Sequence, residues 1–204
     1  MSLFSVLVVV LLLDWRLITQ PHGPWREVAY RGHTTYVAYE DSAEACVRAE
    51  ARGTNSALFY RIPTGYQLSG LRWRWRVLRH PAGANTSVKG LDDRAAAVFV
   101  LVHRSIFPGR SRGLLYQWAN GRDRGHWTRS PYEPGIKVIT LENAPADSGW
   151  RSEQRDLRED LRVAFGAVPT KVEAVGILCD ADDTGGHAIA DFGPLEILAR
   201  DAAR

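Results

Sequence analysis

Three aspartates lie within four residues of one another at a glycine-bearing turn. Asp180, Asp182 and Asp183 are followed by Thr184 and two glycines, and apolar runs flank the segment on both sides. Carboxylates this close repel one another unless a cation lies among them or their oxygens accept hydrogen bonds from backbone amides. One hypothesis is a calcium ion bound by these four residues, because oxygen ligands suit calcium better than zinc or copper. Capping of the turn and direct contact with a substrate are the alternatives.

The same turn has part of the spacing of an EF-hand calcium loop. Asp180, Asp182 and Thr184 would take the first, third and fifth places, and Asp191 would take the twelfth. The usual final glutamate is missing and no flanking helices are predicted. We therefore assign Asp191 to the strand that follows the turn.

A second group of charged residues directly precedes an apolar run. It contains Lys89, Asp92 and Asp93. Paired carboxylates at the start of a strand can cap turn amides. Alternatively, they could join Arg155 and Asp160 in a polar cluster that binds a ligand or performs acid–base chemistry. An internal network of ion pairs would give the same pattern.

Motifs of known catalytic sites are absent from the chain. It has no G-x-S-x-G, H-E-x-x-H, Walker or G-x-G-x-x-G pattern, and its six histidines are scattered singly. Glu153 and Asp160 could form the carboxylate pair of a glycoside hydrolase, whose two groups must straddle the scissile bond. The residues do not settle whether the chain is an enzyme, and the missing motifs favour a protein that is not one.

Tryptophans are the second candidate class of ligand-binding residue. Residues 71–77 alternate apolar residues with arginines, which predicts a strand with two tryptophans on one face. These tryptophans could pack in a core with the arginines outside, or they could line a groove for sugar rings beside an arginine stripe for an anionic polymer. Elsewhere, Trp118, Trp127 and Trp150 are candidates for stacking on a sugar.

Short apolar or alternating runs, separated by turn residues, predict the elements that must position these side chains. The pattern is typical of an antiparallel β-protein. A single helix is predicted over 154–165, because its apolar residues recur every four positions before a glycine and a proline. The clearest strands are predicted at 56–62, 71–78, 95–102, 114–119, 136–141, 171–179 and 188–198.

Length and composition are consistent with one β-sandwich domain. The 204 residues, 45% of them hydrophobic, can bury a sizeable core. We expect that domain over 25–204, after an apolar segment at 1–24 that is either a first strand or the remnant of a signal or anchor. The net charge of +3 comes from arginines interspersed with acids, which argues against nucleic acid as a partner. The apolar run at 3–13 is too short to span a bilayer as a helix.

The two cysteines, Cys46 and Cys179, have no metal-ligand spacing. They are either a buried free pair or one disulfide, so the redox compartment does not follow from them.

Taken together, the motifs resemble a bacterial family of domains of unknown function, DUF3047. The resemblance runs from about Trp25 to Leu198. It implies a jelly-roll β-sandwich similar to galactose-binding and carbohydrate-binding modules, in proteins that are often exported. The motifs that carry it are S-A-L-F-Y-R at 56–61, L-R-W-R-W-R-V at 71–77, K-G-L-D-D-R-A-A at 89–96, Y-Q-W-A at 116–119, W-R-S-E-Q-R-D at 150–156, D-L-R-V-A-F-G at 160–166 and D-A-D-D-T-G at 180–185.

Two positions depart from the family pattern. Asp183 stands where the family usually has asparagine, and Pro194 stands where it usually has aspartate after glycine. A proline removes a backbone donor, so Pro194 predicts an edge strand or a bulge. A periplasmic or extracellular location is implied by the resemblance, although this chain has no complete signal peptide.

Our reading of the sequence is a non-catalytic binding module for a glycan or other small polar, polyhydroxylated ligand. The alternatives are a hydrolase or lyase that uses the charged cluster, and a structural or assembly protein that pairs with a protein partner through its apolar N-terminal strand. Calcium is the only cofactor expected. The ligand-binding residues we expect are Lys89, Asp92, Asp93, Trp118, Trp127, Trp150, Glu153, Arg155 and Asp160.

Overall fold

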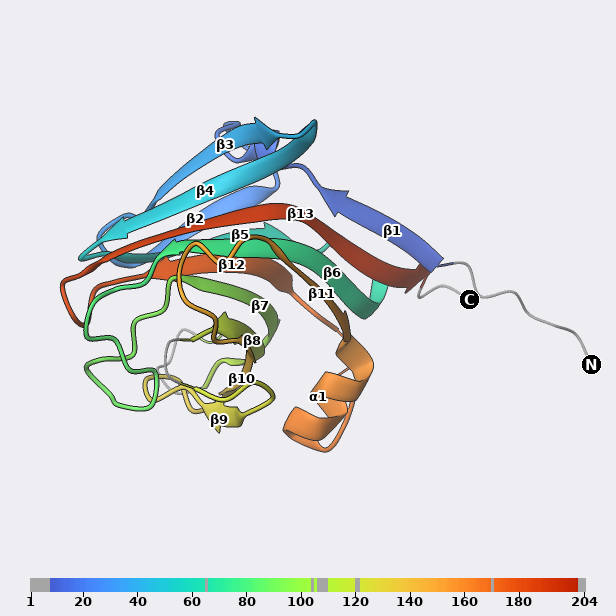
Figure 1. The fold of residues 1–204 in the computed structure, drawn as a ribbon. Helices are drawn as coiled ribbons and strands as arrows, with labels where there is room; N and C mark the ends of the chain where they lie inside the picture. Colours follow the sequence, from blue (N-terminus) through green and yellow to red (C-terminus); the bar gives the residue numbers. More distant parts are fainter. Residues whose placement is uncertain are drawn as a thin grey trace, which may run out of the picture.

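The computed structural model is a sandwich of two β-sheets with one short helix, as the sequence predicts (Figure 1). The structure describes residues 8–64, 66–103, 105, 110–119, 122–169 and 171–201.

In the described part of the chain the smaller sheet has six strands and the larger sheet has seven. The smaller sheet runs in the order β11 (Arg151–Asp156), β6 (Tyr66–Arg79), β13 (His187–Asp201), β4 (Glu44–Arg52) and β3 (Thr35–Asp41), and β1 (Val8–Leu13) pairs with β13. The larger sheet runs in the order β2 (Trp25–Arg31), β5 (Asn55–Arg61), β12 (Ala174–Asp180), β7 (Ala96–His103), β8 (Arg112–Trp118), β10 (Ile136–Glu142) and β9 (Trp127–Arg129). The pairing is antiparallel between these described strands except for β8 with β10, which run parallel.

The alternation in β6 places its tryptophans in the core. Trp73 and Trp75 are buried between the sheets and their rings meet edge-on, with centroids 5.5 Å apart. On the opposite face Arg74 and Arg76 lie over the ring of Trp150, at 4.4 and 4.6 Å. The core interpretation of this segment therefore holds. Its arginines are paired with aromatic and acidic side chains of the chain itself.

One α-helix, α1 (Leu157–Phe165), follows β11 and lies at the end of the smaller sheet (Figure 1). Asp156 caps its first turn by accepting hydrogen bonds from the amides of Arg158 and Glu159, each at 3.0 Å. The helix ends at Gly166, which has a φ of 74°. The predicted start at residue 154 was three residues early, because β11 keeps pairing with β6 through Asp156.

Part of the apolar N-terminal segment, residues 8–13, forms a strand inside this chain, and residues 1–7 lie outside the described residues. Strand β1 pairs with residues 195–200 of β13, while β4 pairs with residues 187–192 of the same strand. The register of β13 shifts between Phe192 and Leu195, at the point where one neighbour replaces the other. Pro194, which has no N–H to donate, lies in this irregularity, so the bulge predicted from the sequence is present. A protein partner for β1 stays a prediction.

Both cysteines are free and buried. Cys46 is on β4 of the smaller sheet and Cys179 on β12 of the larger sheet. The alternative of a disulfide is therefore wrong. No helix in the described residues is both long enough and apolar enough to cross a membrane.

Larger-sheet strands carry apolar side chains on both faces. Inward-facing residues such as Val98, Tyr116 and Ile177 join the main core between the sheets. Because successive side chains alternate across a strand, their neighbours Phe99 and Leu115 lie on the outer face, where they belong to a second, separate apolar cluster. An outer face of this kind is unusual, since a sheet face turned away from the core is commonly polar.

Candidate functional site

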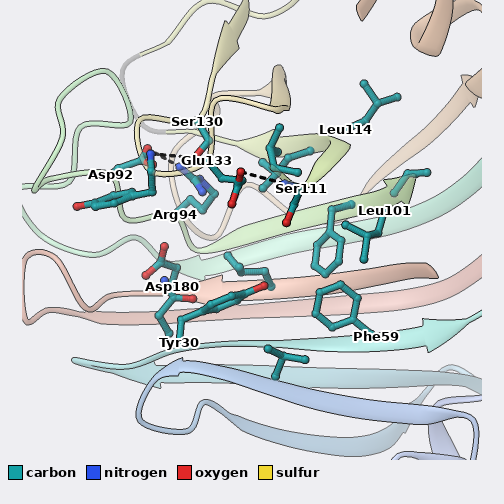
Figure 2. A pocket seen from close by; sticks show the side chains of 18 of the residues that line it. Tyr30, Phe59, Asp92, Arg94, Leu101, Ser111, Leu114, Ser130, Glu133 and Asp180 are labelled. Atoms are coloured by element: carbon teal, nitrogen blue, oxygen red, sulfur yellow. Dashed lines mark hydrogen bonds and ion pairs between the residues drawn. The ribbon is translucent and has the colours of Figure 1, made fainter. Parts of the chain in front are cut away.

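A cavity of about 660 Å³ lies against the outer face of the larger sheet (Figure 2). This volume is within the range of small-molecule sites. Its apolar wall includes Phe59, Phe99, Leu115 and Leu178, which come from four neighbouring strands. Phe59 and Phe99 meet edge-on with ring centroids 4.4 Å apart.

Acidic residues gather at one end of the cavity. Asp180, at the end of β12, lines it together with Asp182 and Asp183 from the following turn, and Asp92 reaches it from the segment before β7. The buried Arg94 lies among them, pairs with Asp92, and donates from Nε to the side chain of Gln117 at 3.1 Å. The polar end is therefore strongly acidic, with one guanidinium built into it.

Two segments at this end hold each other in place. The carboxylate of Asp93 accepts hydrogen bonds from the amides of Asp183 (2.9 Å) and Thr184 (2.8 Å), and from the Thr184 hydroxyl. In return, Asp183 accepts one from the amide of Asp92 at 3.0 Å. The aspartate turn is thus capped by a carboxylate from the other segment. Capping, one of the three interpretations from the sequence, accounts for Asp93, Asp183 and Thr184.

Asp180 and Asp92 are the two most deeply buried acids that line the cavity. Asp180 is 4% exposed. Burial raises its pKa well above the usual range, and the nearby charge of Arg94 opposes this rise only in part. The Oδ1 atom of Asp180 accepts a long hydrogen bond, 3.4 Å, from the amide of Asp182. Burial also raises the pKa of Asp92, against the opposing effect of Arg94.

The arrangement tests the calcium hypothesis in detail. One carboxylate oxygen each of Asp93, Asp180 and Asp182 lie within 4.8 Å of one another, and such an all-oxygen set suits calcium. The EF-hand correspondence is wrong, however. Asp191 lies on β13, where it bonds to Arg48 and Arg76, and Thr184 donates its hydroxyl to Asp93.

Asp183 likewise points away from this set and accepts a hydrogen bond of 2.7 Å from the hydroxyl of Tyr132. A cation at this end would therefore be held by Asp93, Asp180 and Asp182, and not by the four residues of the turn. Calcium binding stays a prediction.

None of the three predicted stacking tryptophans is among the described residues that line the cavity. Trp118 is 0% exposed and donates from Nε1 to the carbonyl of Ala144 at 2.8 Å, so its ring cannot stack on a ligand. Trp127, on β9, packs against the main core. Trp150 lies under two arginines and donates to Asp41 at 3.2 Å. We expected free indole rings, whereas each of these rings is packed against side chains of the chain itself.

The larger sheet separates the charged residues that we expected to form one polar cluster. Asp160 accepts hydrogen bonds from the Tyr116 hydroxyl (2.8 Å) and from Arg155 Nε (2.9 Å). Tyr116 faces the core, whereas its neighbour Gln117, the partner of Arg94, lies on the outer face of the sheet. Arg155 and Asp160 therefore belong to an internal network, and the predicted cluster that joins them to Asp92 and Asp93 does not form.

Glu153 also lies on the core side. It accepts a hydrogen bond of 3.3 Å from Nε1 of Trp75, and burial raises its pKa. Glu153 lines a separate hollow of about 340 Å³ on the smaller sheet, together with Trp73 and Arg74, whereas Asp160 is held by Arg155 and Tyr116 and does not reach that hollow, so the predicted catalytic pair does not form. Lys89 lies near the polar end of the cavity, with Nζ 5.3 Å from the ring centroid of Tyr132.

Most of the apolar wall was not predicted from the sequence, and neither were several polar residues of the cavity, among them Asn55, Arg94 and Tyr132. The sequence does contain a signal for this apolar wall. Strands β7 and β12 are apolar at nearly every position, which indicates burial on both faces.

Three solved structures of enzyme domains are similar in fold to this chain. The xyloglucanase domain of NopAA, a type three effector from Sinorhizobium fredii, is 10% identical, with a TM-score of 0.48 and coverage of 88% of this chain and 100% of that one. Endoglucanase cel12A from Rhodothermus marinus is 15% identical, with a TM-score of 0.49 and coverage of 94% and 99%. Endoglucanase 3 of family GH12 from Trichoderma harzianum is 8% identical, with a TM-score of 0.44 and coverage of 89% and 100%.

These comparisons correct one prediction. We expected a non-catalytic binding module, whereas the similar solved structures are named as xyloglucanase and endoglucanase enzymes. No curated protein matches the chain. The sequence model of one family does match, over residues 23–196, and confirms the resemblance found in the sequence. The chain thus belongs to DUF3047, a family described as proteins of unknown function.

Proposed function

We propose that the chain is a hydrolase that cleaves a glycosidic bond in the cavity on the outer face of the larger sheet. The observation that carries this proposal is a close pair of carboxyl groups, Asp180 and Asp182, at the polar end of that cavity. One of the two is buried and holds its proton more tightly than usual, while the other is more exposed. Two acids in unequal environments are what acid–base hydrolysis needs.

Asp180 is the proton donor in this scheme. Its raised pKa keeps the carboxyl protonated to higher pH than an exposed aspartate, so it can give a proton to the oxygen of the leaving group as the glycosidic bond breaks. The deprotonated Asp180 then takes a proton from the water that completes hydrolysis. The amide of Asp182, at 3.4 Å, orients the Asp180 carboxyl toward this role.

Asp182 is the carboxylate that faces the developing positive charge on the sugar. Asn55 Nδ2 donates to its Oδ1 at 3.1 Å, and Arg31 lies 4.0 Å from its Oδ2. One of its oxygens lies within 4.8 Å of an oxygen of Asp180, so the two carboxyl groups can act on the same glycosidic bond.

A glycan as the substrate, which was also the ligand expected from the sequence, suits the chemistry of the polar end. Carboxylates and an amide oxygen accept hydrogen bonds from sugar hydroxyls. Tyr30, which is 60% exposed, and Tyr132 provide aromatic rings at the same cavity. These contacts support a single sugar ring at this end.

The test is an assay of the purified protein on a panel of nitrophenyl glycosides and oligosaccharides, with Asp180→Asn and Asp182→Asn as variants. Each variant should lose about 10²- to 10⁴-fold in turnover, the usual contribution of acid–base catalysis. Glu159→Gln is the control, because Glu159 lies on α1 in an ion pair with Arg162. Its activity should match that of the unaltered protein. Hydrolysis that survives Asp180→Asn, or an unaltered protein that hydrolyses none of the panel, would overturn the proposal.

A further inference from the structure

Beyond the acidic end, the sheet side of the cavity offers no side-chain hydrogen bonds to a sugar, whereas the loop residues Ser105, Ser111, Ser130 and Glu133 line the cavity as well (Figure 2). The side chains of this part of the sheet are carbon only: Ala57, Ala97, Phe99, Leu115, Val138 and Leu178 form one cluster, and Phe59 and Ile136 pack against it. This cluster is separate from the main core and lies on the outer face of the sheet. Phe99, Leu115 and Leu178 of this cluster line the cavity directly, as do Phe59 and Ile136.

This wall argues against a second and third sugar ring. A hydroxyl buried without a partner is unfavourable, so each added ring would leave several unpaired groups against Phe59 and Phe99. A hydrocarbon chain or an aromatic ring would instead lose unfavourable contact with water there. The sheet side of the cavity is thus divided into an apolar part and an acidic part.

An unpaired acceptor marks the boundary between the two parts. The Oδ1 atom of Asn55 is buried and has no hydrogen-bond partner in the described residues. Its orientation is fixed, because Nδ2 of the same amide donates to Asp182, and a carboxylate can only accept from it. Asn55 also lines the cavity. A buried acceptor left open in this way calls for a donor from a ligand, such as a sugar hydroxyl.

We infer that the substrate is an amphipathic glycoside, a single sugar that bears an alkyl, acyl or aryl group. The sugar lies at Asp180 and Asp182 and donates a hydroxyl to Asn55, while the apolar group lies along Phe59, Phe99 and Leu178. This inference rests on the proposed function for its reaction, but the recognition it describes can be measured without any turnover.

The first experiment compares the binding of methyl and hexyl glycosides of the same sugar by calorimetry, below the concentration at which micelles form. Glucosides, galactosides, xylosides and mannosides are each tested as a matched pair. The protein is Asp180→Asn, so that no substrate is consumed. We expect the hexyl compound of one pair to bind at least about fiftyfold more tightly, because each buried methylene favours binding about fourfold and at least three should be buried.

Two variants assign the parts of the cavity. Phe59→Ser should weaken binding of the hexyl glycoside by about tenfold or more and leave the methyl glycoside unchanged. Asn55→Ala should weaken both compounds by a similar factor, since both carry the sugar. Val37→Thr, at an exposed position on β3, is the control and should change neither.

A neutral apolar dye, N-phenyl-1-naphthylamine, gives a second measurement if Phe59→Ser does not fold. Its fluorescence in the unaltered protein should be lost when the hexyl glycoside is added, and not when the methyl glycoside is added. Equal affinity for methyl and hexyl compounds in every pair would overturn the inference.

The inference and the proposed function can fail separately. Tight hexyl binding without hydrolysis of any glycoside would uphold the amphipathic ligand and reject the hydrolase. Hydrolysis of unsubstituted oligosaccharides with no preference for a hexyl or aryl group would uphold the hydrolase and reject the amphipathic substrate.

Discussion

Asp180 and Asp191 are both buried aspartates beside arginines, yet their environments shift their acidity in opposite directions. For Asp180, burial outweighs the charge of Arg94 and the pKa rises. For Asp191, burial also acts to raise the pKa, but hydrogen bonds from Arg48 and Arg76 outweigh it and the pKa falls. The difference is one of direct contact, because Asp191 accepts three charge-assisted hydrogen bonds. A carboxylate without such bonds is costly to bury, and this cost makes Asp180 suitable as an acid.

Asp180→Asn should stabilise the fold at high pH. The folded pKa of Asp180 is above the ordinary value of 3.8, so the stability it contributes is fully present below pH 3.8 and is lost as the pH rises through the folded pKa. Asparagine has no charge to bury. We expect the melting temperature of the variant to exceed that of the unaltered protein by a few degrees at pH 8, and the difference to vanish near pH 4. Thermal melts across this range check it, and a variant that is less stable at pH 8 would contradict it.

Asp191→Asn should show the opposite dependence. Its folded pKa is lowered, so its contribution is present above pH 3.8 and is lost as the pH falls through the folded value. Replacing one partner leaves Arg48 and Arg76 without their carboxylate. Because both arginines are partly exposed, we expect a loss of about 2–3 kcal/mol at pH 7, near the lower end for breaking a buried ion pair. Urea unfolding at pH 7 and at pH 3 measures the loss, which should shrink at the lower pH.

At the scale of elements, the central strand β12 joins the core to the cavity. Its inward residues Val175 and Ile177 pack in the core, while Leu178 and Asp180 face the cavity. Gly176, two residues before Leu178, lies on the same outer face of the strand. A Cβ at Gly176 would be 2.9 Å from the ring of Phe99 and 2.2 Å from the backbone oxygen of Leu58. The missing side chain lets the aromatic rings of the wall lie directly on the strand.

Gly176→Ala should therefore disturb the apolar wall more than the fold around it. The added methyl must displace Phe99 or move β12 away from β5, and overpacking of this kind costs about 1–3 kcal/mol. We expect a lower urea midpoint and weaker binding of N-phenyl-1-naphthylamine. Gly83→Ala, at a turn where a Cβ meets nothing within 4 Å, is the control for glycine replacement in general, although its φ of 74° brings some strain of its own. Dye binding that stays unchanged in Gly176→Ala would contradict the placement of the wall.

At the scale of the whole molecule, the apolar strands can be predicted from the sequence, whereas the polar strands β2 and β3 cannot. The run at 71–78 is predicted because leucine, tryptophan and valine alternate there with arginine, and the run at 188–198 because most of its residues are apolar. Strands β2 and β3 were missed, since most of their side chains are at least partly exposed and give no apolar period. Their pairing with β5 and β4 is decided by tertiary contact.

The site was half predicted for a related reason. Charged residues such as Asp92 and Asp180 stand out in a sequence, and both reach the cavity. A sequence does not say which face of a doubly apolar strand meets the core, so Phe99 and Leu178 were not singled out. The wrong prediction that Trp118 stacks on a sugar has another cause. Its indole donates to the carbonyl of Ala144, a partner 26 residues away that no local pattern reveals.

Calcium binding can be decided by its effect on the stability of the whole protein. If Asp93, Asp180 and Asp182 hold the ion, calcium at a hundredfold excess over its dissociation constant should add about 2.7 kcal/mol, by mass action. EDTA should remove the gain, and so should Asp182→Ala. Thermal melts with calcium and with magnesium measure it. Equal melting temperatures with calcium and with EDTA would leave these aspartates to capping and to the proposed chemistry.

Strand β1 completes the edge of the smaller sheet where β4 no longer reaches it. It covers the stretch of β13 that follows Pro194, and Leu13 inserts into the core with 2% exposure. Removal of residues 1–13 should unpair this edge, lower stability by several kcal/mol and promote association through the open strand. Urea unfolding and size-exclusion chromatography with light scattering measure both effects. The double variant Val10→Thr/Leu12→Thr is the matched control, since these side chains are 51% and 64% exposed and should matter little to folding. A truncated protein that is as stable and as monodisperse as the full chain would show that β13 does not need β1.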